Sequence, residues 1–369
     1  MVVKNNYNEC ITNLACSIRK YFNLDYKHNT LPYIDELLEN KKPKNVVLLL
    51  FDGMGSNIID NVLDKDAFLI KNRIKKITTV FPATTVAATT SILTGLNPVE
   101  TGMLGWNSYY KDLDKVIVTF YNVEKGDKNK TVIDEAIKYR KKHMLEKTII
   151  ESINEKKEYK AYGFFPFGNN PYSDISDMLD SVIKLCNQDG KKYIYGYDDN
   201  PDGIMHVFGS DSKNAIEAIK YRNYLVEELS KKVKDTIIFV IADHGHTNVI
   251  NIKLDDYPDI TDCLIRNTSL ESRTVSFFVK PKKKKDFVIL FNKYFSDDFD
   301  LYSKEEVIES KLFGDGKENE IYRDSLGDYI AIAKANKCLL YHGDLDAKSQ
   351  HAGYLDDEIY IPLIVIDRV

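Results

Sequence analysis

The sequence predicts an α/β fold in which a doubly wound, mostly parallel central sheet is flanked by helices. Short apolar runs without polar alternation recur along the chain, which is typical of strands buried on both faces of a parallel sheet. Stretches with a helical pattern separate these runs. Strands and helices that alternate in this way indicate a sheet covered by helices on both sides.

Each expected element rests on its own pattern. The central strands are predicted at four apolar runs, Val46–Phe51, Tyr193–Tyr197, Thr236–Ala242 and Ile361–Ile366. Helical patterns between these strands include Ser173–Leu185 and Ser212–Lys232.

The chain is expected to form a single domain over residues 1–369, with a smaller α+β insertion at approximately 251–341. This stretch fits the pattern of the central sheet poorly. Within it, two segments have the composition of strands, Val275–Val279 and Tyr329–Ala333.

Composition and charge exclude several classes of protein. The net charge of -5 gives no general attraction for polyanions, so a nucleic acid is not an expected partner. The five cysteines are scattered and form no CxxC pair, so reduced and mostly buried thiols are expected. Met1–Lys20 has neither a continuous apolar stretch nor a small-residue cleavage site. No signal peptide and no transmembrane segment are therefore expected, and a cytoplasmic location is predicted; the oligomeric state stays open.

Three carboxylates follow predicted strands. Asp52 and Asp243 come directly after two of the apolar runs, and Asp202 lies shortly after a third. Ligands of open α/β sheets bind at the carboxyl ends of the strands. These three side chains are therefore expected to lie within reach of one another.

Histidines accompany two of these carboxylates. His206 follows Asp202 by one helical turn, which brings the pair to one face, and His244 is adjacent to Asp243. His351 lies shortly before the last predicted strand. Any one of these histidines alone would more often be structural, but two Asp-His pairs near strand ends indicate a divalent metal such as zinc.

A threonine-rich segment, 81–95, contains a predicted short helix. Val86–Leu93 has the pattern of a buried helix, and Gly95 is a plausible C′ residue. Thr84 or Thr85 would begin this helix. Either residue could be a plain N-cap, or it could supply a nucleophilic hydroxyl beside N–H groups that stabilise anions.

Taken in order, these blocks resemble the alkaline phosphatase superfamily, and within it the type I phosphodiesterase/nucleotide pyrophosphatase family. The matching blocks are an Asp-Gly after the first strand, a Thr helix that ends in Thr-Gly-Leu-x-Pro, Asp-x-x-x-His, Asp-His-Gly and a C-terminal His. The resemblance implies an alkaline-phosphatase-like fold. It also implies a hydrolase that acts on phosphoric ester or pyrophosphate bonds.

The resemblance further implies two divalent metal ions, most often zinc, with manganese as a possibility. One ion would be held by Asp52, Asp243, His244 and the nucleophile Thr85, and the other by Asp202, His206 and His351. Thr85 is chosen over Thr84 because it stands at the family's distance before the Gly of the Thr-Gly pair. His246 is expected either beside the ligands or facing solvent.

The substrate implied by the resemblance is a small phosphorylated molecule, such as a nucleotide. Asn107 lies near the position of the family's phosphate-contacting Asn, so Asn107 and the adjacent Trp106 are predicted substrate contacts. Ala87-Ala88-Thr89 stands where the family usually has Pro-Asn-His, a difference that bears on the substrate. The alternatives are a phosphonoacetate hydrolase, phosphomonoesterase or phosphomutase-like member, and a catalytically silent metal-binding or interaction protein.

Overall fold

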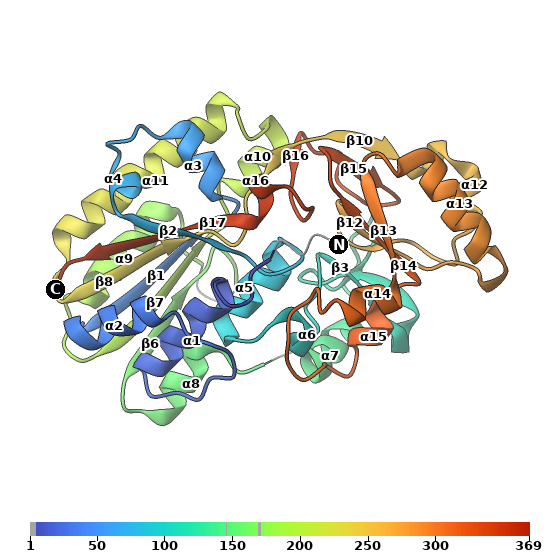
Figure 1. Cartoon of the computed structure of the whole chain (residues 1–369). Helices are drawn as coiled ribbons and strands as arrows, with labels where there is room; N and C mark the ends of the chain where they lie inside the picture. Colours follow the sequence, from blue (N-terminus) through green and yellow to red (C-terminus); the bar gives the residue numbers. More distant parts are fainter. Residues whose placement is uncertain (1–4, 145, 169–170) are drawn as a thin grey trace.

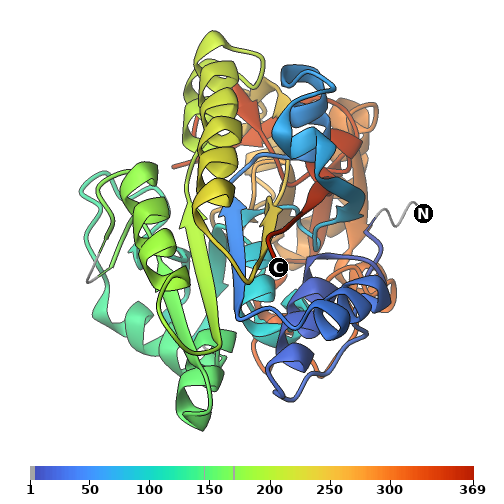
Figure 2. The ribbon, with the colours of Figure 1, turned by 90° about the vertical axis from the view of Figure 1, so that its left-hand side faces the viewer.

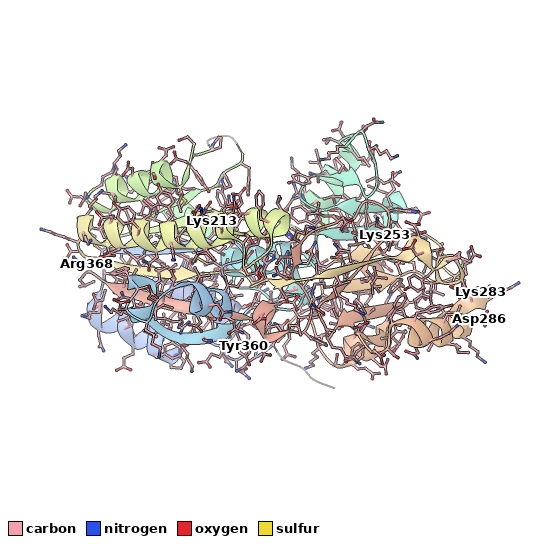
Figure 3. The ribbon with its side chains drawn as sticks, turned by 90° about the horizontal axis from the view of Figure 1, so that it is seen from above. Lys213, Lys253, Lys283, Asp286, Tyr360 and Arg368 are labelled. Carbon is pink, nitrogen blue, oxygen red and sulfur yellow. The ribbon has the colours of Figure 1, made fainter. Side chains whose placement is uncertain are left out.

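The computed structural model describes residues 5–144, 146–168 and 171–369, so the first four residues of the segment Met1–Lys20 lie outside the described part. The described chain forms two lobes, each built on a β-sheet (Figure 1). Seen from above, the lobes lie along one long axis, with Arg368 near one end and Lys283 and Asp286 near the other (Figure 3).

The larger lobe contains a six-stranded sheet with the order β2-β17-β8-β1-β7-β6. Five of these strands run in the same direction and only β17 runs opposite to its neighbours, so the prediction of a mostly parallel sheet is confirmed. The strands, in this order, are Arg73–Thr78, Tyr360–Asp367, Thr236–Ile241, Asn45–Phe51, Lys192–Asp198 and Lys160–Phe164.

Helices cover both faces of this sheet (Figure 2). One face carries α1 (Ile11–Tyr21), α2 (Pro32–Lys41), α5 (Thr85–Thr94) and α8 (Ile149–Lys156). The other carries α3 (Ser56–Val62), α4 (Phe68–Lys71), α9 (Ile175–Cys186) and α11 (Lys213–Lys232). All seven side chains of β1 are buried, as expected for a strand with helices on both sides.

The smaller lobe contains a seven-stranded antiparallel sheet with the order β13-β14-β12-β11-β3-β4-β5. Its strands, in this order, are Phe299–Ser303, Tyr329–Ala333, Thr274–Phe277, Ser269–Leu270, Asn107–Tyr110, Lys115–Val118 and Val123–Glu124. One face packs against α13 (Lys284–Phe295), whose Phe287, Phe291 and Phe295 are buried one turn apart. The shorter helices of this lobe are α6 (Pro98–Thr101), α7 (Asp134–His143), α12 (Pro258–Thr261), α14 (Lys304–Glu309) and α15 (Tyr322–Ser325).

Two chain segments that are far apart in sequence share this smaller sheet. The expected insertion at 251–341 supplies four of its strands, and Asn107–Glu124 supplies the other three. Leu270 of β11 pairs with Asn107 of β3 and joins the two segments. We propose that both segments belong to one subdomain set into a single catalytic domain.

Two short strand pairs and a short helix lie between the lobes. β10 (Ile250–Lys253) pairs with β15 (Lys337–Leu340), and β9 (Thr247–Asn248) pairs with β16 (Ser349–Gln350). α16 (Asp356–Ile359) then leads into β17.

The cysteine prediction is confirmed, because all five cysteines are free and buried. None of the described helices has both the length and the apolar character needed to cross a bilayer.

Candidate metal centre

The carboxyl ends of β7 and β1 are joined by backbone hydrogen bonds. Asp52 N donates to Asp198 O at 2.9 Å, and Asp202 N donates to Asp52 O at 3.0 Å. Asp202 begins α10 (Asp202–Phe208), and Asp243 follows β8. The order of the strands therefore brings the three predicted carboxylates together, where α5, α10 and β16 meet between the lobes (Figure 1).

The first group of possible metal ligands consists of Asp52, Asp243 and His244, all buried. His244 Nε2 lies 3.3 Å from Asp52 Oδ1 and 3.5 Å from Asp243 Oδ2. Asp243 Oδ1 accepts hydrogen bonds from the backbone N–H groups of Gly53 and His244, whereas its Oδ2 accepts no hydrogen bond from the described residues. A buried carboxylate oxygen without a hydrogen bond is costly, and a cation would satisfy it.

Thr85 places its hydroxyl at this group. Its Oγ1 lies 3.2 Å from His244 Nε2 and 3.4 Å from Asp52 Oδ2. Thr84 is the N-cap of α5, but its side chain makes no capping bond; it points to Glu271 instead, with Oγ1 2.5 Å from Oε1. The first N–H groups of α5 are thus left without a side-chain cap beside the Thr85 hydroxyl.

The second group consists of Asp202, His206, His246 and His351. Asp202 Oδ1 lies 3.3 Å from His206 Nε2, 2.5 Å from His246 Nε2 and 3.9 Å from His351 Nε2. The two groups are adjacent, since the rings of His244 and His351 stack with centroids 3.8 Å apart.

The three predicted histidine ligands are oriented in the same way. Nδ1 lies at hydrogen-bond distance from a backbone carbonyl in each, namely Ser349 O for His206, Gly245 O for His244 and Ala83 O for His351. An Nδ1–H that donates to a carbonyl leaves Nε2 with a free lone pair. Such partners fix the tautomer of metal-binding histidines, and here they turn each Nε2 toward the carboxylates.

His246 differs from the other three histidines. It is buried, so the alternative that it faces solvent is wrong. Two ligands of one tetrahedral zinc ion stand about 3.3 Å apart, given bonds of about 2.0 Å. The 2.5 Å between His246 Nε2 and Asp202 Oδ1 is a hydrogen-bond distance instead, and Nδ1 lies 2.8 Å from Ser349 Oγ. His246 therefore holds the carboxylate of Asp202.

Burial and crowding of like charges dominate the electrostatics of the site. Burial, followed by the charges of Asp243 and Asp202, raises the pKa of Asp52 well above its usual value. Burial opposes ionisation of Asp202 as well, but His206 and His246 hold its pKa well below the usual range. Burial lowers the pKa of His351 well below its ordinary value. No described Lys or Arg pairs with these carboxylates, so a bound cation is the charge that would balance them.

A recess of about 250 Å³ opens onto the site. Thr85, Asp202, His206 and His351 line it together with the two predicted substrate contacts, Trp106 and Asn107. The structure thus brings the predicted nucleophile, both ligand sets and both predicted substrate contacts to one place.

Two residues of the site were not predicted from the sequence. The Tyr197 hydroxyl, at the end of β7, donates a hydrogen bond to Asp52 Oδ2. Glu271 lines the recess and accepts hydrogen bonds from Thr84 and from the backbone N–H of Trp106. Tyr197 continues an apolar strand, and Glu271 lies in an insertion. No local sequence pattern therefore marks either residue as part of the site.

Close backbone packing requires glycine in the turn after β8. A Cβ on Gly245 would lie 1.9 Å from Asp357 O. The Asp-His-Gly turn therefore packs directly against α16, the helix that follows His351.

Comparison with known proteins identifies relatives of this fold. Residues 46–355 match the family model for type I phosphodiesterase / nucleotide pyrophosphatase. The chain matches no curated protein by sequence. It is similar in structure to murine ectonucleotide pyrophosphatase / phosphodiesterase 5, with a TM-score of 0.66, 18% identity and coverage of 86% of this chain and 87% of that one.

Two other solved structures are comparable. The human ectonucleotide pyrophosphatase / phosphodiesterase 5 has a TM-score of 0.65 at 19% identity, covering 87% of each chain. Phosphonoacetate hydrolase from Sinorhizobium meliloti 1021, in complex with phosphonoformate, has a TM-score of 0.62 at 15% identity, covering 88% of this chain and 90% of that one. The murine protein is also known as an inactive Thr-to-Ala variant in complex with AMP. At these identities the likeness shows a shared fold.

Proposed function

The chain belongs to the type I phosphodiesterase/nucleotide pyrophosphatase family, and from this we propose that it is a two-metal phosphodiesterase with Thr85 as its nucleophile. The observation that carries the proposal is the position of the Thr85 hydroxyl. It contacts Asp52 and His244 of the first group, and a stacked histidine pair links that group to the second.

The donor atoms fit two divalent cations. Asp52, Asp243 and His244 would hold one ion together with Thr85 Oγ, and Asp202, His206 and His351 would hold the second. In each group, a histidine Nε2 lies 3.3 Å from a carboxylate oxygen, close to the separation of about 3.3 Å between two ligands of tetrahedral zinc. Mixed imidazole and carboxylate ligands suit zinc, and manganese accepts the same donors.

Thr85 supplies the attacking atom in the mechanism we infer. Its Oγ forms a bond to phosphorus while the bond from phosphorus to the leaving alcohol or phosphate breaks, and the leaving oxygen takes up the hydroxyl proton of Thr85. The intermediate is a phosphodiester between Thr85 and the part of the substrate that remains on phosphorus. A water molecule then attacks phosphorus, restores the Thr85 hydroxyl and releases the second product. The two ions, when bound, supply positive charge that stabilises the attacking and leaving oxygens.

The start of α5 supports the same step. Its first N–H groups have no side-chain cap, so they are available to the unesterified oxygens of the substrate. His244 and Asp52 fix the position of Oγ, and the bond from Tyr197 fixes Asp52 in turn. The chain thus orients the nucleophile before the substrate binds.

We propose a phosphodiester or nucleotide pyrophosphate as the substrate, in preference to a phosphomonoester. The helix segment Val86–Leu93 offers no cationic side chain for the additional charge of a monoester. Trp106 supplies an aromatic surface in the recess for a second ester group such as a nucleoside. The murine relative binds AMP, which agrees with a nucleotide.

Two alternatives make different predictions. A phosphonoacetate hydrolase would cleave a carbon–phosphorus bond. The likeness of that enzyme to this chain is a likeness of fold alone. A catalytically silent protein would have no need for both complete ligand groups together with a hydroxyl placed between ligands and recess. We therefore place the diesterase first.

The test compares substrates under controlled metal content. Hydrolysis of bis-p-nitrophenyl phosphate should fall to background after exhaustive chelation and return with zinc or manganese, because the proposed mechanism depends on the positive charge of the two ions. Full activity in protein shown by metal analysis to be metal-free would contradict the proposal. A preference of about tenfold or more for p-nitrophenyl phosphate, roughly 1.4 kcal/mol in the transition state, would overturn the diesterase assignment.

A further inference from the structure

The recess beside Thr85 has an unusual charge for a phosphate-binding site. Among the described residues that line it, none is Lys or Arg, whereas Asp202, Glu271 and Asp344 carry carboxyl groups. Asp202 belongs to the second ligand group. Glu271 and Asp344 belong to neither ligand group.

Asp344 is neutralised by the protein itself. Its Oδ1 lies 2.8 Å from Lys125 Nζ, with both side chains almost fully buried, and its Oδ2 accepts the backbone N–H of Tyr341 at 2.9 Å. Glu271 has no such partner, because no described basic side chain forms an ion pair with it. Glu271 is therefore the carboxylate of the recess that has neither a basic partner in an ion pair nor a place in a ligand group.

Glu271 is held in a fixed position between the two segments that meet the substrate. Its Oε1 accepts a hydrogen bond from Thr84 Oγ1 at 2.5 Å and another from Trp106 N at 2.7 Å. Thr84 directly precedes the nucleophile, and Trp106 directly precedes Asn107. The other oxygen, Oε2, receives no hydrogen bond from any described residue.

The charge of Glu271 matters because it completes the balance of the site. Two divalent ions would bring four positive charges, and the three ligand carboxylates remove three of them. An ionised Glu271 cancels the remaining one. A phosphodiester carries a single negative charge on two unesterified oxygens, whereas a phosphomonoester above its second pKa of about 6 carries two. The carboxylate of Glu271 would repel the dianion more strongly than the monoanion. It would therefore weaken the binding of a phosphomonoester more than that of a phosphodiester.

We propose that Glu271 is a specificity-determining residue whose carboxylate disfavours phosphomonoesters and so enforces the diester preference. This inference rests on the proposed function. It assigns the preference to an acidic residue inside the recess, in addition to the lack of a cation on α5.

The protonation of Glu271 sets the conditions of the test. Burial raises the pKa of Glu271 to about 7, and Asp344 contributes in the same direction. The bonds from Thr84 and Trp106, with the charge of His206, lower it. Measurements at pH 8.5 therefore examine the ionised carboxylate.

The experiment uses the metal-loaded enzyme and its Glu271→Gln variant, in which the amide oxygen can still accept both hydrogen bonds of Oε1. The ratio of kcat/KM for bis-p-nitrophenyl phosphate to that for p-nitrophenyl phosphate should fall about tenfold or more, mainly because the monoester is cleaved faster. Glu271→Asp keeps the charge and should keep the preference. Glu309→Gln, an exposed change of the same charge on α14, should leave the ratio unchanged.

A binding measurement gives a readout that does not depend on turnover. In metal-loaded Thr85→Ala protein, the added Glu271→Gln change should tighten the binding of inorganic phosphate about tenfold or more by calorimetry. Binding of dimethyl phosphate, a monoanion, should change much less. Equal effects on the two ligands, or none on phosphate, would overturn the role of Glu271. If the wild-type enzyme cleaves neither ester, the proposed function fails, and the phosphate arm still decides on Glu271.

Discussion

Arg273 and Glu358 form a fully buried bidentate ion pair, in which Nε donates to Oε1 at 2.6 Å and Nη2 to Oε2 at 2.7 Å. Arg273 directly precedes β12 of the smaller lobe, and Glu358 lies in α16 beside the main sheet. Glu358 also accepts the backbone N–H groups of Gly353 and Leu355. The pair therefore holds the segment that follows His351 between the two lobes.

Removal of Arg273 should be strongly destabilising. Arg273→Ala leaves the carboxylate of Glu358 buried without a cation, so the free energy of unfolding should fall by about 3–5 kcal/mol. Denaturant unfolding at neutral pH measures the loss. Arg323→Ala is the control, since Arg323 pairs with Glu318 at the surface, and there we expect little or no loss of stability. Similar small losses in both variants would contradict the structural role of the buried pair.

The two adjacent threonines at the start of α5 should have unequal effects on activity. Thr85→Ala removes the nucleophile, so kcat/KM for a diester should fall by a factor of about 1,000 or more while the fold is kept. Thr84→Ala removes only a hydrogen bond to Glu271 and should cost far less. Thr85→Ser should retain part of the activity. If Thr84→Ala were the inactive variant, the nucleophile would be Thr84.

His246 should affect the affinity for one metal ion without changing the number bound. His246→Ala removes the group that holds Asp202, and loss of such a partner typically weakens metal binding about 10–100-fold. Competition with a chromogenic chelator measures both affinity and stoichiometry. His342→Ala is the control, because the exposed His342 pairs with the exposed Asp255. A drop from two bound ions to one would show that His246 is itself an essential ligand.

Glu271 should make the stability of the metal-free protein depend on pH. Burial raises its pKa from 4.5 to about 7 in the folded state, so folded protein binds a proton that unfolded protein has released between these values. Stability attributable to Glu271 is therefore present below pH 4.5 and is lost as the pH rises to about 7, by roughly 2–3 kcal/mol.

The measurement compares wild-type protein with Glu271→Gln at several pH values. Glutamine does not titrate, so the variant should gain stability relative to the wild type as the pH rises from 4.5 to 7. Asp344 and His206 also face this group, and they are unchanged in both proteins. A stability difference that is independent of pH would contradict a raised pKa for Glu271.

The inner strands of the main sheet could be predicted from the sequence, whereas its edge strands could not. β1 and β8 are buried on both faces, and their apolar runs show this directly. β2, Arg73–Thr78, lies at an edge and carries exposed charged side chains, so it lacks the apolar signal. Edge strands commonly carry charges, which protect an open edge from aggregation.

The same distinction separates the site residues that could be predicted from those that could not. Asp52 and Asp243 stand at the ends of strands, so a local pattern and a topological rule are enough to bring them together. Glu271 reaches Thr84 only because Leu270 pairs with Asn107, a contact between distant segments that no local pattern encodes. His246 follows a recognisable motif, but its burial depends on β16, a distant strand that contains Ser349.

The position of β17 also constrains how the protein folds. This strand, Tyr360–Asp367, is inserted between β2 and β8, so the sheet is not continuous until it has docked. Before docking, the apolar Thr236–Ile241 has an open edge, which is prone to pairing with other chains. The contacts that close this edge are also far apart in sequence, and such contacts form slowly. Protection from aggregation and the arrival of His351 at the metal centre should therefore occur in one late step of folding.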